Sequence, residues 1–489
     1  MEKYVIAIDQ GTTSTRAIVF DSKQRKVKVS QKEIQVFFPK ASWVEQDANE
    51  IWLSTLAVLA GVFEDGEIKP EQISAIGITN QRETTIVWDK TTGLPIYNAI
   101  VWQSRQTSDL IDEYKNKGIE DVIKEKTGLI LDPYFSATKI RFILDNAKGA
   151  KDNPNLLFGT VDTWLLWKLT NGKVHATDVT NASRTLLFNI NTLTWDDDLL
   201  KIFDIPKTML PEIKDTSGLF GYTSKEHFFN YECPIMSMVG DQQAALFGES
   251  CFEKGEIKNT YGTGGFMLIN TGNEVVHSKY GLLSTVAWKI NNEVKFALEG
   301  SIFVSGSLIQ WLRDELKFFD DAAKTDALAR SVPDSNGVII VPAFTGLGAP
   351  YWKKECKGAI FGLTRGSSQG HITRAALEAM AYQSKDLVEV MQKDINNTVK
   401  ELKVDGGASA NTYLLEFQSN ILGIPVTKLE NAETTALGAA RLAGLQVGLY
   451  TYDDFKDEKF SVYKPNMDEK TRNELYAKWK KAIDSTIAF

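Results

Sequence analysis

Two apolar, β-branched runs open the chain and flank a short polar turn. The runs are Val5–Ile8 and Ala17–Phe20, and the turn between them carries one glycine and four hydroxyl side chains. This pattern predicts a strand–turn–strand hairpin in which Asp9 ends the first strand. Hydroxyl and backbone N–H groups at such a tip can hold phosphate, and a nearby carboxylate can hold the Mg²⁺ that neutralises it. An ordinary hairpin with a polar tip explains the same pattern.

Helical and strand patterns alternate through the rest of the first half. The periodicity predicts strands over 73–79, 86–89 and 99–102, and helices over 48–63, 107–116, 119–126 and 136–146. A further strand is expected to end at Phe158–Asp162, before a helix over 163–169. Residues 190–235 are polar, contain several Pro and Gly, and predict an irregular segment. The strand Met236–Gly240 then leads into a helix for which Asp241 is the expected N-cap.

Polar residues that directly follow two of these strands are candidates for substrate contact. Arg82 and Glu83 come after the strand 73–79, and Asp241 follows the strand Met236–Gly240. Ligands of open α/β sheets bind beyond the carboxyl ends of the strands. A solvated Arg/Glu pair in a turn explains the first two residues as well, and helix capping explains Asp241. The pattern therefore makes these residues candidates, but it does not decide between substrate contact and a purely structural role.

The second half opens on a hairpin pattern similar to the first. Residues 257–269 again form a strand–turn–strand pattern, with Thr263 at a glycine-rich turn. Two similar hairpins predict an α/β chain with a duplicated domain. A composition break near 249–255 places the boundary, giving domains over 1–250 and 251–489. A phosphate chain gripped between the two tips is a physical reason for such a duplication.

The remaining pattern adds a second group of candidate residues. A strand is expected over 338–342 and a long helix over 371–394, and the strand that begins at Leu402 runs into a glycine turn at a helix start. Small residues at that turn leave room for a flat ring or a sugar, and a helix N-terminus favours an anion. A helix that begins near Thr435 has a small-residue face that permits close packing.

Composition narrows the class of protein. The 489 residues allow two or more domains, and a net charge of −8 with dispersed lysines does not indicate a nucleic-acid surface. The longest apolar stretch, 51–63, is too short to span a bilayer, and no signal peptide is expected. Three distant cysteines indicate a reducing cytoplasm, with neither a disulfide framework nor a zinc site. The P-loop, dinucleotide-binding and protein-kinase motifs are not found in the sequence.

Six motifs in this order resemble the carbohydrate-kinase superfamily, and most closely those of its members that phosphorylate glycerol. They are Asp9–Arg16, Asn80–Thr84, Gly240–Gly248, Asn259–Phe266, Phe344–Trp352 and Val404–Asn411. The resemblance implies two duplicated actin/hexokinase-like (ribonuclease H-like) α/β domains, with ATP and glycerol in the cleft between them. It also implies the reaction of ATP with glycerol to give ADP and sn-glycerol 3-phosphate, with Mg²⁺, as the first step of glycerol catabolism.

The matching motifs carry the family's binding residues onto this chain. The residues implied for glycerol are Arg82, Glu83, Trp102, Tyr134, Asp241, Gln242 and Phe266. Those implied for the nucleotide phosphates are Thr12, Thr13, Ser14, Arg16 and Thr263, and those for the adenosine are Gly306, Gln310, Gly407 and Asn411. The residue types suit a triol, which needs hydrogen-bond donors and acceptors together with aromatic cover for its carbon faces.

Phosphoryl transfer needs positioning, charge neutralisation and a proton acceptor. We assign the proton acceptor to Asp241, as general base. A helix N-terminus would keep its carboxylate ionised and weakly basic, which suffices if the proton leaves late in a loose transition state. Asp9 is expected to orient the Mg²⁺ through water, while Arg16 stabilises the transferred charge. Closure of the cleft on its substrates is expected to exclude water.

One stretch departs from part of the family. Some bacterial relatives carry a Gly/Arg loop for inhibition by fructose 1,6-bisphosphate before the motif that contains Asp241, and Lys225–Pro234 has no such loop. It resembles instead the histidine-bearing loop of Gram-positive relatives, which the phosphocarrier protein of the phosphotransferase system phosphorylates. This makes His227 a candidate regulatory phosphosite; a surface histidine among aromatic residues explains it equally well. The resemblance also suggests a homo-oligomer, a dimer or a tetramer.

Three other functions stay open at this point. The nearest is a kinase of the same superfamily that acts on a longer sugar or polyol. Another is an ATP-driven binding protein of the actin or heat-shock type, which would require an appended peptide-binding domain or filament surfaces. The third is a sensor that has kept the fold and lost catalysis. The presence of Asp9, Thr12, Arg82, Glu83 and Asp241 argues against the third.

Overall fold

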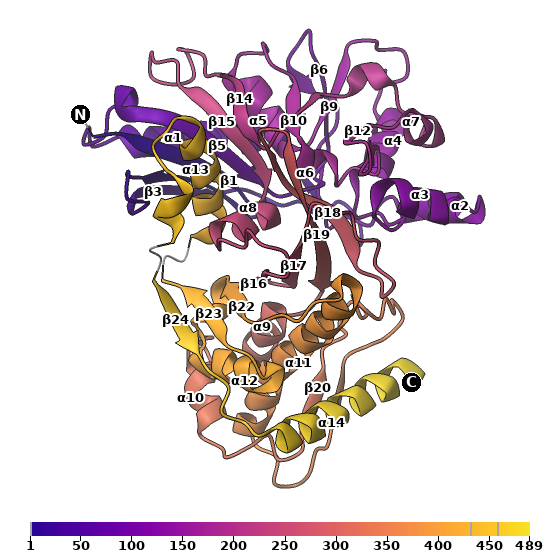
Figure 1. The fold of residues 1–489 in the computed structure, drawn as a ribbon. Helices are drawn as coiled ribbons and strands as arrows, with labels where there is room; N and C mark the ends of the chain where they lie inside the picture. The colour runs from indigo at the N-terminus through magenta and orange to yellow at the C-terminus, as the bar shows by residue number, and fades with distance from the viewer. Residues whose placement is uncertain (1, 431–432, 457–458) are drawn as a thin grey trace.

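One 13-stranded sheet runs through two lobes that lie one above the other (Figure 1). This computed structural model describes residues 2–430, 433–456 and 459–489. The strand order is β24-β23-β22-β16-β17-β19-β18-β14-β15-β5-β1-β2-β3. The upper lobe holds the strands from β14 to β3 in this order, and the lower lobe holds those from β24 to β17, with β18 and β19 between them.

The upper lobe is built on the opening hairpin. Strands β1 (Tyr4–Gln10), β2 (Ser14–Phe20) and β3 (Lys26–Glu33) are antiparallel neighbours, as the alternation predicts for the first two. Strands β5 (Ile73–Asn80) and β15 (Pro234–Gly240) run parallel to β1. Their last residues are in register, because Asn80 pairs with both Gln10 and Gly240. The residues that follow these three strands therefore leave the sheet at one edge.

The lower lobe repeats this order. Strands β16 (Ile257–Tyr261), β17 (Gly265–Gly272) and β19 (Glu293–Ile302) are antiparallel neighbours, and β22 (Leu402–Asp405) and β23 (Val426–Leu429) run parallel. The sequence β19-β17-β16-β22-β23 corresponds to β3-β2-β1-β5-β15 of the upper lobe. The structure thus confirms the duplication that the two hairpin patterns predict.

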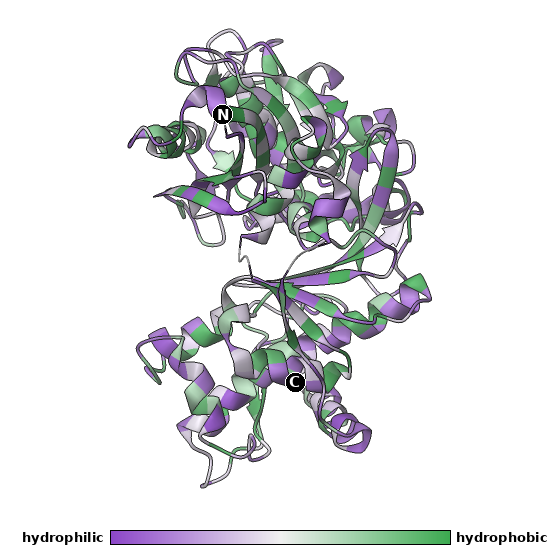
Figure 2. Ribbon diagram, turned by 60° about the vertical axis from the view of Figure 1, so that its left-hand side comes forward, coloured by the Kyte–Doolittle hydropathy of each residue, from purple (hydrophilic) through white to green (hydrophobic). Residues whose placement is uncertain are grey.

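Helices cover both faces of the sheet. In the upper lobe they are α1 (Ala48–Phe63), α5 (Val161–Leu169), α6 (Val179–Ala182), α8 (Asp241–Gly248) and α13 (Thr434–Gln446). In the lower lobe they are α9 (Gly306–Asp314), α10 (Lys324–Arg330), α11 (Gln369–Ile395), α12 (Thr412–Leu422) and α14 (Glu469–Ala488). The ribbon in Figure 2 shows hydrophobic residues along the strands of the sheet and a mixture of hydrophobic and hydrophilic residues along the helices.

The other elements surround the upper lobe, complete the 13-stranded sheet or form a separate two-stranded sheet in the lower lobe. The helices are α2 (Ser108–Asn116), α3 (Glu120–Thr127), α4 (Ser136–Asn146) and α7 (Asp197–Ile202). The longer strands are β6 (Ile86–Asp89), β9 (Leu156–Gly159), β14 (Ser217–Tyr222), β18 (Leu283–Ile290) and β24 (Phe460–Tyr463). The short ones are β4 (Glu45–Gln46), β7 (Leu94–Pro95), β8 (Ala99–Ile100), β10 (Ala176–Asp178), β11 (Phe188–Asn189), β12 (Thr194–Trp195), β13 (Glu212–Lys214), β20 (Ile339–Val341) and β21 (Ala359–Phe361).

Helix α13 belongs to the second half of the chain but packs on the upper lobe, against α8, β1 and β5 (Figure 1). The contact is made through glycines. A Cβ on Gly438 would lie 1.9 Å from the carbonyl oxygen of Ala244, and one on Gly248 would lie 2.0 Å from that of Thr434. The close packing predicted from the small-residue face of this helix is confirmed.

Three local predictions are wrong. Residues 190–235 are not irregular but contain α7, β13 and β14. The prediction failed for β14 because the two glycines of Ser217–Tyr222 hide the alternation that is typical of a strand. Asp162 lies in the first turn of α5 and not at a strand end. Gly240, with extended backbone, is the N-cap of α8, so Asp241 is the first helical residue.

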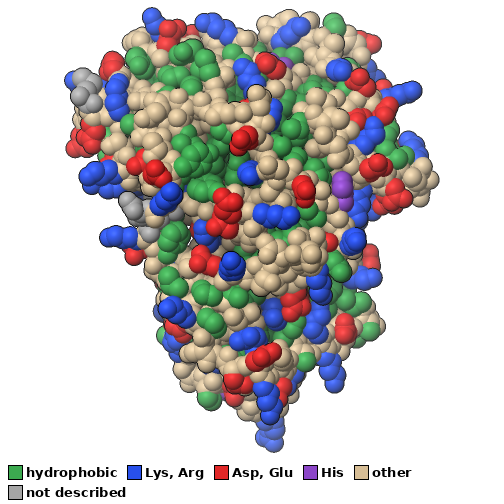
Figure 3. All heavy atoms as spheres, viewed as in Figure 1, with side chains coloured by type: hydrophobic (Ala, Val, Ile, Leu, Met, Phe, Trp, Pro, Cys, Tyr) green, Lys and Arg blue, Asp and Glu red, His purple; other side chains and the backbone are tan. Residues whose placement is uncertain are grey.

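The surface is mixed in charge. Lys and Arg side chains alternate with Asp and Glu side chains over the face shown in Figure 3. Among the residues that the structure describes, no helix has the length and apolar character needed to cross a membrane.

Candidate active site

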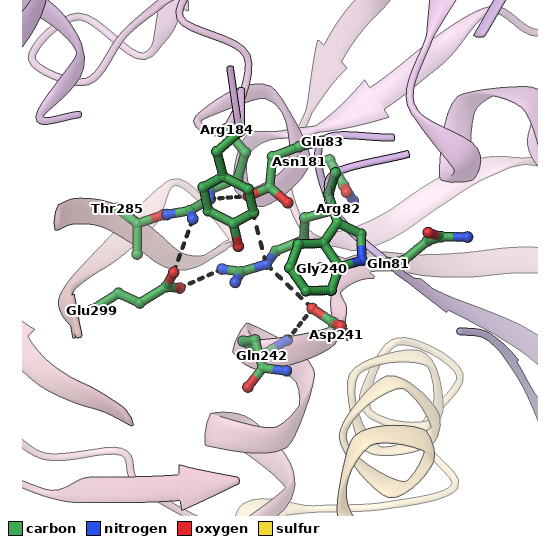
Figure 4. A network of polar contacts seen from close by, with 12 residues as sticks. Gln81, Arg82, Glu83, Asn181, Arg184, Gly240, Asp241, Gln242, Thr285 and Glu299 are labelled. Atoms are coloured by element: carbon green, nitrogen blue, oxygen red, sulfur yellow. Dashed lines mark hydrogen bonds and ion pairs between the residues drawn. The ribbon is translucent and has the colours of Figure 1, made fainter. Parts of the chain in front are cut away.

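A cluster of buried charges forms where β5 and β15 end. Arg82 follows β5 and is 3% exposed. Its Nε lies 3.2 Å from Oδ1 of Asp241, and its Nη1 donates to Oε2 of Glu299 over 2.5 Å (Figure 4). One guanidinium therefore joins the start of α8 to strand β19, which lies between the lobes.

Arg184 extends this cluster to Glu83. Its Nε donates to Oε1 of Glu83 over 2.6 Å, and its Nη2 donates to Oε1 of Glu299 over 2.8 Å (Figure 4). Burial alone would raise the pKa of Glu299, but the guanidinium groups of Arg184 and Arg82 lower it to about 2. Two arginines thus alternate with the carboxylates of Glu83, Glu299 and Asp241.

Sequence reasoning missed Arg184 and Glu299. Glu299 is the single charge in the otherwise uncharged run Phe296–Ile302, which pairs with strands on both sides. Burying an unpaired carboxylate costs free energy, so a single glutamate in an apolar strand indicates a buried partner of opposite charge. The sequence therefore contained a signal for Glu299. Arg184 lies in a loop after α6, and its surroundings in the sequence carry no comparable signal.

Glu83 has an unusual backbone conformation. Its φ is 62°, in the left-handed region that disfavours residues with a side chain. Its carbonyl oxygen accepts hydrogen bonds from Oγ of Ser136 at 3.1 Å and from Nζ of Lys139 at 3.4 Å. Strained residues that are held in this way cluster at functional sites.

Three aromatic rings lie beside the charges. Trp102 meets Tyr134 edge-on at 5.7 Å between ring centroids and Phe266 at 6.0 Å. Phe266 belongs to β17 of the lower lobe, so the group crosses between the lobes. The guanidinium of Arg184 stacks over Tyr134 at 5.5 Å. The rings and the charges thus form one site with polar and apolar walls.

Asp241 is the most accessible of the carboxylates. Its side chain is 30% exposed, and its Oδ1 accepts a hydrogen bond from the backbone N–H of Gln242 at 2.7 Å. Burial raises the pKa of Asp241 above its ordinary value, against the lowering effect of the charges on Arg82 and Lys258. Burial therefore acts against the weak basicity that the helix N-terminus predicts for this carboxylate. Lys258 itself hydrogen-bonds Oε1 of Gln242 and Oγ1 of Thr260.

The first hairpin tip lies next to the aromatic rings. Gly11 N–H donates to the carbonyl of Ser14 at 2.9 Å, which closes the turn, and Trp102 Nε1 donates to Oγ1 of Thr12 at 2.9 Å. Thr13 is exposed at the tip. Below the tip, Nη2 of Arg16 lies 2.5 Å from Oδ2 of Asp9. The other terminal nitrogen of Arg16 lies 2.7 Å from Glu433, at the start of α13.

The second hairpin tip is part of a glycine-lined surface. Gly306 N–H donates to the carbonyl of Gly262 at 3.0 Å, and Ser305 N–H donates to that of Thr263 at 3.0 Å. A Cβ on Gly406, which has φ +83°, would lie 2.4 Å from the carbonyl oxygen of Tyr261, whereas one on Gly407 would meet nothing within 4 Å. The tip, the start of α9 and the turn after β22 therefore adjoin with little side-chain cover.

The remaining candidates lie around this surface. Gln310 is exposed on α9, one turn beyond Gly306. Asn411 caps α12 by accepting from Leu414 N–H, and its Nδ2 donates to Oγ1 of Thr325 at 3.0 Å. A cavity of about 870 Å³ opens between α9 and α10, lined by residues that include Arg313, Lys317 and Lys324. It lies farther along α9 than Gln310 and outside the charged cluster.

The candidate residues therefore form two groups. The first contains Thr12, Arg82, Glu83, Trp102, Tyr134, Asp241, Gln242 and Phe266, and the second contains Thr263, Gly306, Gln310, Gly407 and Asn411. Thr13, Ser14, Asp9 and Arg16 belong to the first hairpin, next to the first group. Between described residues, no hydrogen bond joins the tip Thr12–Ser14 to Thr263. His227 belongs to neither group. It is half-buried against Trp52 of α1, with ring centroids 5.1 Å apart.

Two lobes of repeated strand order, each built on a hairpin, define the actin/hexokinase-like class of phosphotransferase folds. The model of the FGGY family of carbohydrate kinases matches residues 4–248 with its N-terminal domain and 257–447 with its C-terminal domain. The chain belongs to this family of carbohydrate kinases.

Relatives and solved structures agree with this assignment. A glycerol kinase of Bacillus cereus is 55% identical over 495 residues, covering 100% of both chains. The crystal structure of Plasmodium falciparum glycerol kinase with ADP superimposes with a TM-score of 0.93 at 37% identity, covering 99% of this chain and 98% of that one. A gluconate kinase from Lactobacillus acidophilus has a TM-score of 0.90 at 21% identity over 100% and 99% of the chains, a likeness of fold alone.

Proposed function

We propose that this chain transfers the γ-phosphoryl group of ATP to a terminal hydroxyl of glycerol. The observation that carries the proposal is the combination of Arg82, Glu83 and Asp241 with a wall of three aromatic rings. Donors and acceptors on one side suit the hydroxyls of a small triol, and rings on the other suit its carbon atoms. Full-length relatives at 55% identity that are named glycerol kinase support the choice of triol.

In this proposal Arg82 donates to glycerol hydroxyls, and Glu83 and Asp241 accept from them. Gln242 adds an amide, and Trp102, Tyr134 and Phe266 cover the carbon atoms. Asp241 takes the proton of the hydroxyl whose oxygen bonds to the γ-phosphorus, and ADP leaves with the electrons of the broken P–O bond. Asp241 suits this role because it combines access to solvent with a raised pKa.

ATP is proposed to lie between the two hairpin tips. Thr12, Thr13, Ser14, Arg16 and Thr263 would hold the phosphates through hydroxyl, guanidinium and backbone N–H groups. Gly306, Gln310, Gly407 and Asn411 would hold the adenosine, where glycines leave backbone within reach of a flat ligand. The support is the open position of Gly407 and the adjoining backbone of Gly262 and Gly306.

The residues present fit a Mg²⁺ that is held mainly by phosphates and water. Among described residues, no three His, Cys, Asp or Glu side chains gather as a metal cage. Mg²⁺ on nucleotides commonly needs only one or two carboxylates. Asp9 keeps one oxygen outside its ion pair with Arg16 and would orient the ion. When bound, Mg²⁺ neutralises phosphate charge.

A substrate panel tests the proposed function. Purified protein is given Mg²⁺-ATP with glycerol, dihydroxyacetone, xylulose or gluconate, and ADP release is measured. We expect activity chiefly with glycerol. A preference for one of the sugars would overturn the choice of substrate. Slow ADP release that none of the four changes would favour an ATP-driven binding protein.

Gly406→Ala should weaken nucleotide binding. The new methyl group would collide with the carbonyl of Tyr261 at a left-handed backbone position. If the turn moves to relieve the strain and thereby loses about 1–3 kcal/mol of nucleotide binding free energy, the KM for ATP rises by about 5- to 150-fold. Gly448→Ala is the matched control, because its φ is +68° but its Cβ would meet nothing within 4 Å. An equal effect of both variants would contradict the prediction.

His227 is proposed as a phosphosite for the phosphocarrier protein of the phosphotransferase system. The support is its half-buried position in an aromatic loop, between Ser224 and the exposed Phe229. The protein is incubated with the labelled phosphorylated carrier, with His227→Ala as the control. We expect label on His227 and a changed kinase rate. Equal labelling of the control, or an unchanged rate, would contradict the proposal.

Three further assignments are proposals on the same basis. We propose a glycerol-binding domain over 1–250 and an adenosine-binding domain over 251–489. The reaction is placed in the cytoplasm, in keeping with the free and buried Cys233, Cys251 and Cys356. A homo-oligomer, a dimer or a tetramer, is expected.

A further inference from the structure

The charged cluster contains two residues, Arg184 and Glu299, to which the proposed reaction gives no role. Both side chains are fully buried. Neither follows one of the parallel strands that end at the site. Each touches residues that are proposed to contact glycerol: Arg184 contacts Glu83 and Tyr134, and Glu299 contacts Arg82.

Stability alone does not explain this arrangement. Buried ion pairs seldom stabilise a fold more than well-packed apolar side chains would. In addition, Nη1 of Arg184 is buried and has no hydrogen-bond partner among the described residues. A buried donor without a partner lowers the free energy of unfolding, and so destabilises the fold. An arrangement with such a cost calls for another reason.

The contacts of the cluster restrict Arg82 and Glu83 in a specific way. For Arg82, Nε faces Asp241, and Nη1 donates to Glu299 and, at 3.2 Å, to Gln243. For Glu83, Oε1 accepts from Arg184. Among described residues, Nη2 of Arg82 and Oε2 of Glu83 take part in none of these contacts. Each side chain is therefore anchored by one set of atoms and keeps another polar atom for a ligand.

We propose that Arg184 and Glu299 are positioning residues, which fix the Arg82–Glu83 pair so that Nη2 and Oε2 face the hydroxyls of the bound triol. The inference rests on the proposed function. Glu299 also connects this pair to the lower lobe. Its strand, β19, pairs Ser301 with Phe266 and Ile302 with Gly265, next to the second hairpin tip. Strand β19 thus fixes the position of Arg82, through Glu299, and that of Phe266, through strand pairing.

The proposal predicts an effect on glycerol and not on ATP. In Glu299→Gln the side chain keeps its size but loses the charge that holds Arg82. In Arg184→Lys the charge is kept, but one ammonium cannot bridge Glu83 and Glu299 as the guanidinium does. Losing one anchoring hydrogen bond to a charged group should raise the Kd and KM for glycerol by about 10- to 100-fold. The KM for ATP should change by less than about twofold on the same scale.

The experiment measures glycerol Kd by calorimetry without nucleotide, both KM values and the melting temperature. Glu378→Gln is the matched control. It removes a buried carboxylate that accepts from Arg374 at 2.9 Å and Tyr413 at 2.7 Å in the lower lobe. This control should lower the melting temperature while glycerol and ATP constants stay at wild-type values.

Two results would overturn the inference. One is an unchanged glycerol Kd in the folded variants, and the other is a rise in KM for ATP that matches the rise for glycerol. Should Arg184→Lys fail to fold, the isosteric Glu299→Gln decides alone. A wild-type protein that neither binds nor phosphorylates glycerol would overturn the proposed function instead, so the two failures are distinguishable.

Discussion

Asp241→Asn is expected to lower kcat with glycerol by about 10²- to 10⁴-fold, the usual contribution of a general base. The amide keeps the size of the side chain and can still accept from the N–H of Gln242, but it cannot take a proton. Glycerol affinity should fall far less than kcat, because the amide oxygen can still accept a hydrogen bond from a glycerol hydroxyl. Steady-state kinetics with a coupled ADP assay and calorimetry of glycerol binding measure the two effects separately.

The pH dependence gives an independent check on the same residue. The carboxyl of Asp241 must be ionised to accept a proton, and burial raises its pKa above the ordinary 3.8. Activity of the wild type should therefore fall as the pH drops through this raised value. The residual activity of Asp241→Asn should lack that step. Arg82, Lys258 and Asp9 are the charged neighbours that set the value.

Asp386→Asn is the matched control for Asp241→Asn. It changes a buried aspartate of α11 that accepts from Trp479 Nε1 at 2.8 Å and from the Tyr476 hydroxyl at 2.6 Å, in the lower lobe. We expect lower stability and an unchanged kcat. An Asp241→Asn protein that binds glycerol and keeps most of its turnover would show that the base is another group.

Arg82→Met is expected to destabilise the protein by up to about 3–5 kcal/mol, because it removes one of the two partners of the buried carboxylate of Glu299. Glu299 would keep only Arg184, and Asp241 would lose the nearest positive charge. Glycerol phosphorylation should fall below detection, since the same residue is proposed to donate to the substrate. Chemical denaturation and the kinase assay measure the two losses.

Arg374→Met provides the comparison for Arg82→Met. Arg374 pairs with the buried Glu378 and donates to the carbonyl of Val332 at 2.8 Å. Its loss therefore also removes the ion-pair partner of a buried carboxylate. Its variant should lose stability but keep the KM for glycerol. If both variants lost glycerol phosphorylation to the same degree, the effect of Arg82→Met would be general instability and not loss of a substrate contact.

The sequence predicted the elements whose pattern is local. Helix 48–63 and strand 86–89 have the predicted bounds, and both hairpins form with the predicted turns. Their apolar periodicity is strong and their turns contain Gly and Thr. Strand β14 was missed because two glycines and the exposed Leu219 and Tyr222 break its alternation.

The sequence predicted those residues of the site that belong to recognisable sequence motifs. Arg82, Glu83 and Asp241 follow strands whose ends meet at one edge, so the position of each was legible. Arg184 and Glu299 join them from a loop and from a strand of the other half, across 101 and 217 residues of sequence. The lone charge of Glu299 in an apolar strand indicates that it has a partner, but no local pattern shows which residue that is. Arg184 carries no local signal at all, and its contact with Glu83 depends on tertiary packing.

The placement of α13 has a consequence for synthesis on the ribosome. This helix covers the face of the upper lobe formed by residues such as Val5, Ala7 and Ala75, together with α8. At typical translation rates, roughly 200 residues and about 10–40 s separate the completion of β15 from the emergence of α13. During that interval the part of the apolar face of β1 and β5 that α13 covers stays exposed. The upper lobe is thus begun first and finished almost last, and a nascent chain halted between these points should be a strong client for chaperones.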